Sequence, residues 1–200
     1  MKRATAPGAV RIVGGSLRGS KLAVPALAGL RPTPQRLRET LFNWLMPVIE
    51  GARVLDLFAG SGALGIEAMS RGAAHALLIE RDRAQAAKIS ADLQRLHVAN
   101  ADVLNADALE SLAGPAAQPF DIVFLDPPFE ADLWTRAAAL LDANGWLGVN
   151  TYVYIEAPAE MLPELPSHWR LHRETRAGAV RGALFCPALE DGCFSCAGCA

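Results

Sequence analysis

The segment Asp126-Pro127-Pro128-Phe129 directly follows an apolar run, residues 122–125, and combines an acid, two prolines and an aromatic ring. Two successive prolines fix the backbone and remove N–H donors, so carbonyl oxygens are left as outward acceptors. The exocyclic amino group of a nucleic-acid base has two N–H donors, which the Asp126 carboxylate and the Pro127 carbonyl could accept. Phe129 could stack on the same base. This arrangement suits catalysis by positioning and electrostatics, with no metal and no covalent nucleophile. The alternative interpretation is a plain proline turn after a buried strand.

A second segment of the sequence runs from a hydrophobic strand through a glycine turn into a helix. It contains Asp56, Gly60, Gly62 and Gly65. Glycines allow a tight turn and close approach of the backbone to a ligand, and the helix start offers free N–H groups. The glycines match the G-x-G-x-x-G pattern, so a nicotinamide-binding fold has to be considered. Asp56 argues against that fold, because its carboxylate would repel a pyrophosphate. It suits a cationic ligand instead, such as the amine of a methionine moiety.

Two further acids follow apolar runs. Glu80 stands 20 residues after Gly60, where a carboxylate can accept two hydrogen bonds from ribose hydroxyls. This would hold for either kind of nucleotide cofactor, and a surface acid at a strand end is the alternative. Asp107, followed by Ala108, could hold an adenine amino group, but it could equally cap a helix. Taken alone, the sequence favours the cap.

The chain around these motifs alternates short apolar runs with helical patterns. Strands are expected at 54–58, 76–79, 103–104, 120–125 and 152–155, and helices at 66–69, 84–96, 108–112 and 133–141. This alternation predicts an α/β fold with a mostly parallel sheet covered by helices on both faces. Residues 169–174 and 183–186 are expected to pair as an antiparallel hairpin at its edge. All four motifs then lie at the carboxyl ends of the strands, where open α/β sheets bind ligands.

The first fifty residues differ in charge from the rest. They hold eight Lys or Arg against two acids, whereas residues 51–200 hold 11 against 19. A basic arm on an acidic body suggests a polyanion held at one end, and an ordinary solvated face is the alternative. Residues 10–15 and 21–25 are expected to form two short strands, followed by a helix that starts near Thr33-Pro34. Arg36 and Arg38 fall off the apolar stripe of that helix and are expected to be exposed.

Composition sets broader limits. A chain of 200 residues, 52% of them hydrophobic, fits one globular domain of ordinary size. No apolar run reaches the roughly 20 residues needed to cross a bilayer, and the N-terminal residues do not look like a secretory signal. The cysteines cluster near the end of the chain, which favours a reducing compartment, so we expect a cytoplasmic protein with no membrane contact.

The residues together resemble a known family. The segment Asp126–Phe129 resembles the signature of amino-group methyltransferases that act on adenine, cytosine or guanine. A wider set of segments is similar to the bacterial 16S rRNA guanine-N2 methyltransferases. This set comprises the core motifs and residues 11–15, 18–22, 31–33, 36–45, 171–174 and 177–178. The resemblance covers residues 10–187, and the Arg31-Pro32-Thr33 helix entry is its most specific part.

The resemblance implies a Rossmann-like class I S-adenosylmethionine-dependent methyltransferase fold with a small N-terminal hairpin. We expect a basic hairpin and helix extension that binds RNA over residues 1–50, a methyltransferase core over 51–190 and a cysteine-containing tail over 191–200. The substrate would be one guanine of 16S rRNA in an assembled or partly assembled small subunit. Apart from the resemblance, we expect the protein to be a monomer. The residues expected to hold S-adenosylmethionine are Asp56, Phe58, Ala59, Gly60, Gly62, Glu80, Arg81, Asp107 and Ala108. Those expected to hold guanine are Asp126, Pro127, Pro128 and Phe129, and those expected to contact RNA phosphates are Arg11, Arg18, Lys21, Arg31, Arg36 and Arg38.

Three alternatives remain open at this stage. A DNA adenine-N6 or cytosine-N4 methyltransferase shares the chemistry but needs a larger target-recognition region. A nicotinamide oxidoreductase explains the glycines but neither Asp56 nor the Asp126 turn. A non-catalytic RNA-binding protein has no need of Asp126. The cysteine-containing tail is a departure from the family. Cys193, Cys196 and Cys199 could bind zinc together with Cys186, but their spacing does not form the familiar arrangement of two cysteine pairs. We therefore expect no metal site and a dispensable, disordered tail.

Overall fold

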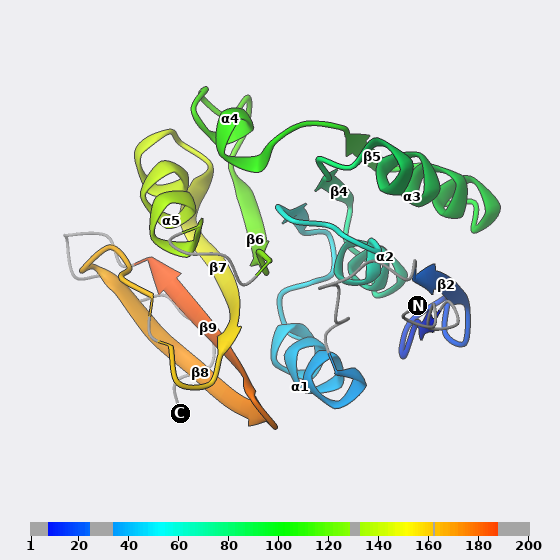
Figure 1. Ribbon diagram of the computed structural model, residues 1–200, viewed down its shortest axis with the longest axis horizontal. Coiled ribbons are helices and arrows are strands. Elements are labelled where there is room, and N and C mark those ends of the chain that lie inside the picture. Colours follow the sequence, from blue (N-terminus) through cyan, green and yellow to red (C-terminus); the bar gives the residue numbers. More distant parts are fainter. Residues whose placement is uncertain (1–7, 25–33, 129–132, 162, 188–200) are drawn as a thin grey trace, which may run out of the picture.

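The computed structural model describes residues 8–24, 34–128, 133–161 and 163–187 (Figure 1). Its strands are β1 (Gly8–Arg11), β2 (Lys21–Val24), β3 (Arg53–Asp56), β4 (His75–Ile79), β5 (Ala101–Leu104), β6 (Phe120–Leu125), β7 (Leu147–Pro158), β8 (Trp169–Ala177) and β9 (Val180–Pro187). Its helices are α1 (Gln35–Leu45), α2 (Ala63–Ser70), α3 (Arg83–Arg95), α4 (Ala108–Leu112) and α5 (Leu133–Ala143). None of these described helices is long and apolar enough to span a bilayer.

Seven strands form one sheet in the order β5-β4-β3-β6-β7-β9-β8. The pairs from β5 to β7 are parallel, and β9 pairs antiparallel with both β7 and β8. From β3 the chain moves outward to β4 and β5, then returns to add β6 on the other side of β3. The strand order therefore reverses between β3 and β6, which is the point where such sheets bind ligands. The predicted fold class, with its antiparallel C-terminal edge, is confirmed.

Each face of the sheet is covered by its own apolar cluster. One cluster packs α1, α2 and α3 against the strands and includes Val10, Ile12 and Leu22 from the N-terminal hairpin. The other packs α4 and α5 against the opposite face. Figure 1 shows β1 and β2 beside α2, and α5 beside β7. Because the hairpin shares a core with the sheet, its position is fixed relative to the strand ends that carry the motifs.

Strand β7 is longer than the predicted residues 152–155. Its pairing with β6 is irregular, since Phe120 lies opposite Leu147 whereas Ile122 lies opposite Tyr152. The Thr151 side chain holds this irregular stretch, because its hydroxyl donates to the Phe120 carbonyl at 2.7 Å and accepts from the Gly148 N–H at 2.7 Å. The alternation of residues 152–155 revealed the regular part of the strand but not the bulged part.

Candidate active site at the strand reversal

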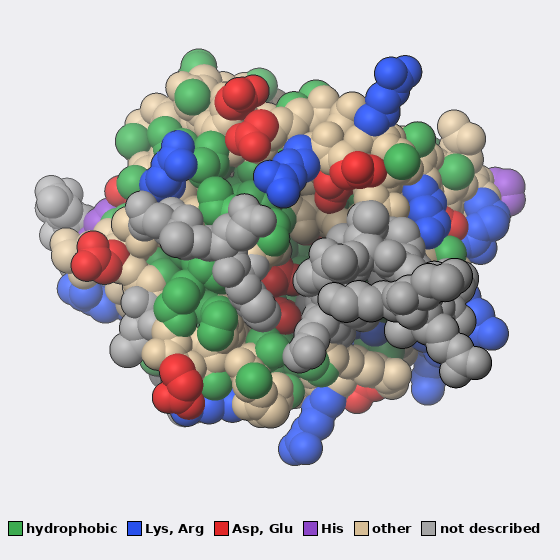
Figure 2. Space-filling model, viewed as in Figure 1, with side chains coloured by type: hydrophobic (Ala, Val, Ile, Leu, Met, Phe, Trp, Pro, Cys, Tyr) green, Lys and Arg blue, Asp and Glu red, His purple; other side chains and the backbone are tan. Residues whose placement is uncertain are grey.

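The fold brings the two central acids of the sequence analysis to one place. In the parallel pair β3–β6, Asp56 lies opposite Phe124, so Asp126 follows two residues beyond that pair. Both acids therefore lie at the carboxyl ends of neighbouring strands, at the strand reversal. Asp56 is buried and Asp126 is half-buried. Figure 2 shows acidic side chains at the centre of the face on which β6 ends in Figure 1.

Asp56 is a buried acid that contacts the first turn of α2. Its side chain is 2% exposed, and its Oδ2 accepts a hydrogen bond from the Gly65 N–H at 2.9 Å. Burial raises the pKa of Asp56 to about 7, the Gly65 N–H lowers it, and the nearby charge of Glu80 raises it. A cationic group placed beside this carboxylate would favour its ionised form. The geometry therefore fits the amine of a methionine moiety.

The glycine loop between β3 and α2 depends on glycine at three positions. Gly60 and Gly62 have φ of 52° and 72°, in the left-handed region that glycine adopts without strain. At Gly65, a Cβ would lie 2.7 Å from Leu78 Cδ2 and 3.3 Å from the Asp56 carboxylate. Gly65 thus lets α2 pack closely on β4 and bring its N–H to Asp56. Without side chains at Gly60 and Gly62, a ligand can approach the backbone at the start of the helix closely.

Glu80, at the end of β4, holds the loop in its described conformation. Its carboxylate accepts from the Gly60 N–H and from the Asp82 N–H, both at 2.8 Å. The ribose contact expected of Glu80 is not tested by these bonds, and it stays a prediction. Asn105, at the end of β5, donates to the carbonyls of Glu80 and Arg81, both at 2.9 Å, and so ties the ends of β4 and β5 together.

The remaining residues predicted to hold the cofactor follow β3, β4 and β5. Asp107 is the N-cap of α4, because its Oδ1 accepts from the N–H groups of Leu109 and Glu110 at 2.9 and 3.2 Å. The sequence preference for a cap is confirmed, and the adenine contact stays a prediction. Ala59 and Ala108 are buried, Phe58 is half-buried and Arg81 is exposed.

The turn after β6 presents the predicted amino-group acceptors. Pro127 is buried and Pro128 is exposed, so the turn leaves the core at this point. Neither proline has an N–H, which is why the backbone here offers only carbonyl acceptors. Phe129 lies outside the described residues.

Sequence reasoning missed two buried polar residues on β7 beside this turn. Leu125 lies opposite Ile155, so Glu156 continues β7 next to Asp126. Glu156 is 3% exposed, and its Oε2 accepts from the Tyr154 hydroxyl at 3.2 Å. Burial, together with the charges of Glu156 and Asp126, raises the pKa of Tyr154 well above its usual value, so this hydroxyl stays protonated. Glu80 was predicted to be functional because an acid there directly follows a β-strand pattern. Glu156 also directly follows such a pattern, so the same criterion would have selected it.

The basic residues of the N-terminal segment fall into two groups. Arg11, Arg18, Lys21 and Arg36 are exposed, as a phosphate contact requires. The expectation that Arg38 is exposed is wrong: it is 3% exposed, and its Nη2 donates to the Arg11 carbonyl at 3.1 Å. Arg38 lies between Leu45 and Phe42 on the buried face of α1, where solvent had been expected. Arg31 lies outside the described residues.

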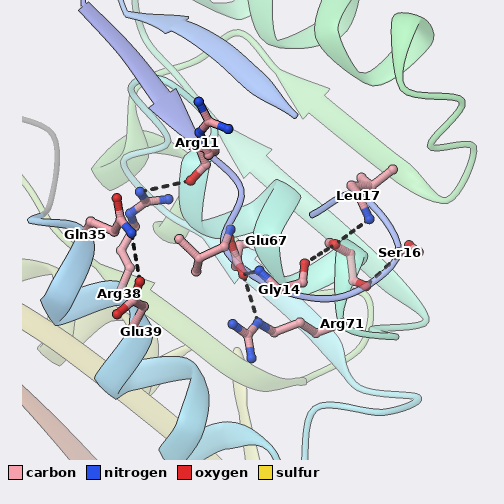
Figure 3. Close-up of polar contacts among 11 residues, drawn as sticks. Arg11, Gly14, Ser16, Leu17, Gln35, Arg38, Glu39, Glu67 and Arg71 are labelled. Carbon is pink, nitrogen blue, oxygen red and sulfur yellow. Dashed lines mark hydrogen bonds and ion pairs between the residues drawn. The ribbon is translucent and has the colours of Figure 1, made fainter. Parts of the chain in front are cut away.

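Glu67 of α2 fixes the N-terminal segment on the core (Figure 3). Its carboxylate is fully buried and accepts from the Val13 N–H at 2.7 Å, the Gly14 N–H at 2.8 Å and Arg71 Nε at 2.9 Å. Arg71 also lies over the Phe42 ring, 5.0 Å from its centroid. These contacts join α2, α1 and the segment after β1. The position of the basic residues therefore depends on a residue more than fifty positions further along the chain.

Within the described residues, no cluster of histidine, cysteine or acidic side chains could hold a metal ion. Cys186 is buried on β9. Cys193, Cys196 and Cys199 lie outside the described residues, as does the whole 191–200 tail, so the expectations for that tail stay predictions.

Comparisons with known proteins place the chain in a family. The model of the family described as Conserved hypothetical protein 95 matches residues 10–186. The chain belongs to this family. Among its curated relatives, "Ribosomal RNA small subunit methyltransferase D" of Escherichia coli K12 is 51% identical over 179 residues, which is 89% of this chain and 90% of that protein. The protein of the same name from Haemophilus influenzae is 44% identical over 183 residues, which is 90% of this chain and 95% of that protein.

Solved structures of the family have the same fold. The "Putative methyltransferase yhhF" of Escherichia coli superposes with a TM-score of 0.84 at 47% identity, over 92% of this chain and all of that one. The "putative methylase HI0767" of Haemophilus influenzae superposes with a TM-score of 0.79 at 40% identity, over 91% of this chain and all of that one. The family resemblance seen in the sequence, the Rossmann-like methyltransferase fold and the S-adenosylmethionine cofactor are thereby confirmed. Methylation of ribosomal RNA agrees with the relatives' names, which do not state the base.

Proposed function

We propose that the protein transfers a methyl group from S-adenosylmethionine to the exocyclic N2 of one guanine in the 16S rRNA of the small ribosomal subunit. The observation that carries this proposal is the position of Asp126-Pro127 at the strand reversal, next to the strand that ends in Asp56. One acid is placed to hold an amino group and the other to hold a cationic cofactor. The names of the relatives supply the class of RNA.

The residues of the chain act mainly by positioning. The Asp126 carboxylate and the Pro127 carbonyl accept the two N–H groups of the guanine amine, which turns the nitrogen lone pair toward the cofactor. The cofactor, when bound, supplies a methyl group already activated by a positively charged sulfur. As the amine gains positive charge, Asp126 stabilises that charge and can take up a proton. No metal ion is needed for these roles.

The cofactor would be held around the glycine loop. Asp56 would face the amine of the methionine moiety, since it is a buried carboxylate with acceptor capacity left beside its bond from the Gly65 N–H. Glu80 would accept the ribose hydroxyls by exchanging its bond to the Gly60 N–H. Asp107 and Ala108, at the start of α4, would lie at the adenine.

The substrate is proposed to be a small subunit, assembled or partly assembled, bound by a cytoplasmic monomer. Arg11, Arg18, Lys21 and Arg36 are exposed and would contact phosphates, so binding should weaken steeply as the salt concentration rises. Figure 2 shows Lys and Arg side chains along the side of the molecule that carries the hairpin and α3. A guanine held at Asp126 must be unstacked, which costs least in a loop.

The test is transfer of labelled methyl groups from S-adenosylmethionine to unmethylated small subunits, naked 16S rRNA and duplex DNA, followed by digestion to nucleosides. The proposal expects N2-methylguanosine from the subunits. Asp126→Ala should reduce transfer by at least about a thousandfold while cofactor affinity changes by less than about threefold, since Asp126 acts on the base. Label in DNA, or near-normal turnover by Asp126→Ala, would contradict the proposal. Absence of label in all three substrates would favour a non-catalytic RNA-binding protein.

A further inference from the structure

A groove of about 310 Å³ lies at the end of α2 that is remote from the cofactor loop. It is lined by Ser16 and Leu17 of the loop after β1, by Met69 of α2 and by the segment 96–100 between α3 and β5. The loop wall is held firmly, because the Ser16 N–H donates to the Ser70 carbonyl at 2.8 Å and the Leu17 N–H to Ser70 Oγ at 2.9 Å. The groove is therefore a preformed feature of the fold.

The lining of the groove combines apolar walls with two polar side chains. Leu17, Leu96 and Val98 contribute apolar surface, while His97 and Asn100 are exposed at its opening. A planar, partly polar group of limited size suits such a lining, because its faces can lie on apolar atoms or stack on the imidazole while its edge meets the amide. The volume is at the lower limit for ligand sites, which fits one nucleobase.

The rim of the groove is basic. Arg18 follows Leu17 and is exposed, as is Lys21 on β2, and neither forms an ion pair with another described residue. Arg95 precedes Leu96, and its Nη2 donates to the Lys21 carbonyl at 3.0 Å, which holds the end of α3 against β2. The acids of the elements around the groove are paired: Asp92 with Arg95 and Asp102 with His75. The rim therefore suits phosphate groups.

We propose that this groove binds an unpaired nucleotide of the substrate RNA, with the base between Leu17 and His97 and the adjoining phosphates on Arg18 and Lys21. The inference rests on the proposed function, because it assigns a second contact to the same RNA. Helix α2, eight residues long, separates the groove from the cofactor loop by about 12 Å along its axis. The bound nucleotide is thus not the methylated guanine but a neighbour that anchors the strand along the N-terminal segment.

Two variants test the groove without altering the core. Ala99→Glu places a negative charge at an exposed position of the lining, and His97→Asn removes the ring at a residue with φ of 56°, a conformation that asparagine tolerates. Each should raise the KM for small subunits by about tenfold, the worth of one stacked or phosphate-bound nucleotide. The kcat and the cofactor affinity should change by less than about twofold. Val149→Glu adds the same charge at a residue 62% exposed on β7, away from the groove, and should leave the KM unchanged.

The partner is identified by crosslinking. A photoreactive p-benzoylphenylalanine at position 99 should crosslink to an unpaired nucleotide of 16S rRNA in the small subunit, mapped by arrest of reverse transcription. A crosslink to a ribosomal protein alone, or an unchanged KM in both variants, overturns the inference. The proposed function is judged separately by N2-methylguanosine formation with the wild-type protein. If no methylation occurs, filter binding of the variants to subunits and the crosslink still decide whether the groove binds RNA.

Discussion

Asp56 and Glu67 are two buried carboxylates that contact the same short helix, α2, and their hydrogen bonding differs. Among the described residues, Asp56 accepts one recorded hydrogen bond, from the Gly65 N–H, whereas Glu67 accepts two backbone N–H groups and the Arg71 guanidinium. A carboxylate has about four acceptor sites. Glu67 is therefore nearly saturated by its own protein, and Asp56 keeps capacity for a ligand. Both acids are buried, so it is the smaller number of donors around Asp56 that supports its proposed role in binding a ligand.

This difference predicts that replacing Glu67 has the larger effect on folding. Glu67→Ala would leave the Val13 and Gly14 N–H groups and the Arg71 charge without their buried partner, so the free energy of unfolding should fall by about 3–5 kcal/mol. Glu67→Gln keeps one acceptor oxygen and should lose about half as much. Urea unfolding followed by circular dichroism measures both. A loss below about 1 kcal/mol for Glu67→Ala would show that the clamp on the N-terminal segment contributes little.

Replacing Asp56 should have the opposite balance of effects. Asp56→Asn removes a charge that the fold buries beside a single N–H, so the free energy of unfolding at pH 8 should rise by about 1–3 kcal/mol. Cofactor affinity should fall by about 10- to 100-fold, because a hydrogen bond to a charged partner is lost. Calorimetric titration with S-adenosylhomocysteine, which keeps the α-amine of the amino-acid moiety, measures the affinity. Unchanged binding would remove Asp56 from the cofactor site.

The raised pKa of Asp56 adds a dependence on pH. Because burial raises this pKa to about 7, above its ordinary value of 3.8, the stability that protonated Asp56 contributes is fully present below about pH 4 and is lost as the pH rises through 7. The cationic ligand needs the ionised form, so cofactor affinity should fall by up to about tenfold per pH unit below 7. Isothermal titration between pH 5.5 and 8.5 checks this trend. Asp56→Asn is the control and should bind with a flat profile over this range.

The difference between these acids also explains what the sequence could predict. Asp56, Glu80 and Asp107 follow apolar strands, and Asp126 ends a β-strand run. A local pattern therefore revealed each of them, and the strand alternation predicted that they share one edge of the sheet. Glu67 lies inside a helix and holds a segment 53 to 54 residues earlier in the chain. No local period encodes such a contact, so only the structure could show it.

The expectation that Arg38 is exposed was wrong for a different reason. Its position in α1 was judged from the stripe of Leu37, Leu41 and Leu45, which identifies one buried face of the helix. Phe42, which that stripe left out, is also buried, and at about 100° per residue Arg38 lies between Leu45 and Phe42 on the same face of the helix. The sequence thus predicted which elements form and where their apolar faces lie, but not how the N-terminal segment covers them.

Arg38 provides the prediction with the smallest effect. Burial lowers its pKa, against the nearby charges of Glu67, Glu39 and Glu156, and within the described structure its Nε and Nη1 have no hydrogen-bond partner. A buried charge with such partial compensation adds little net stability, so Arg38→Met, of similar length, should change the free energy of unfolding by less than about 1 kcal/mol.

Since the Arg38 guanidinium is covered, the salt dependence of subunit binding should also stay the same in Arg38→Met. Arg18→Met should instead reduce the slope of log K against log salt by roughly 0.7–0.9, the value for one lost phosphate contact. If Arg38→Met reduced that slope as much as Arg18→Met, the N-terminal segment would have to move away from Arg38 when RNA binds.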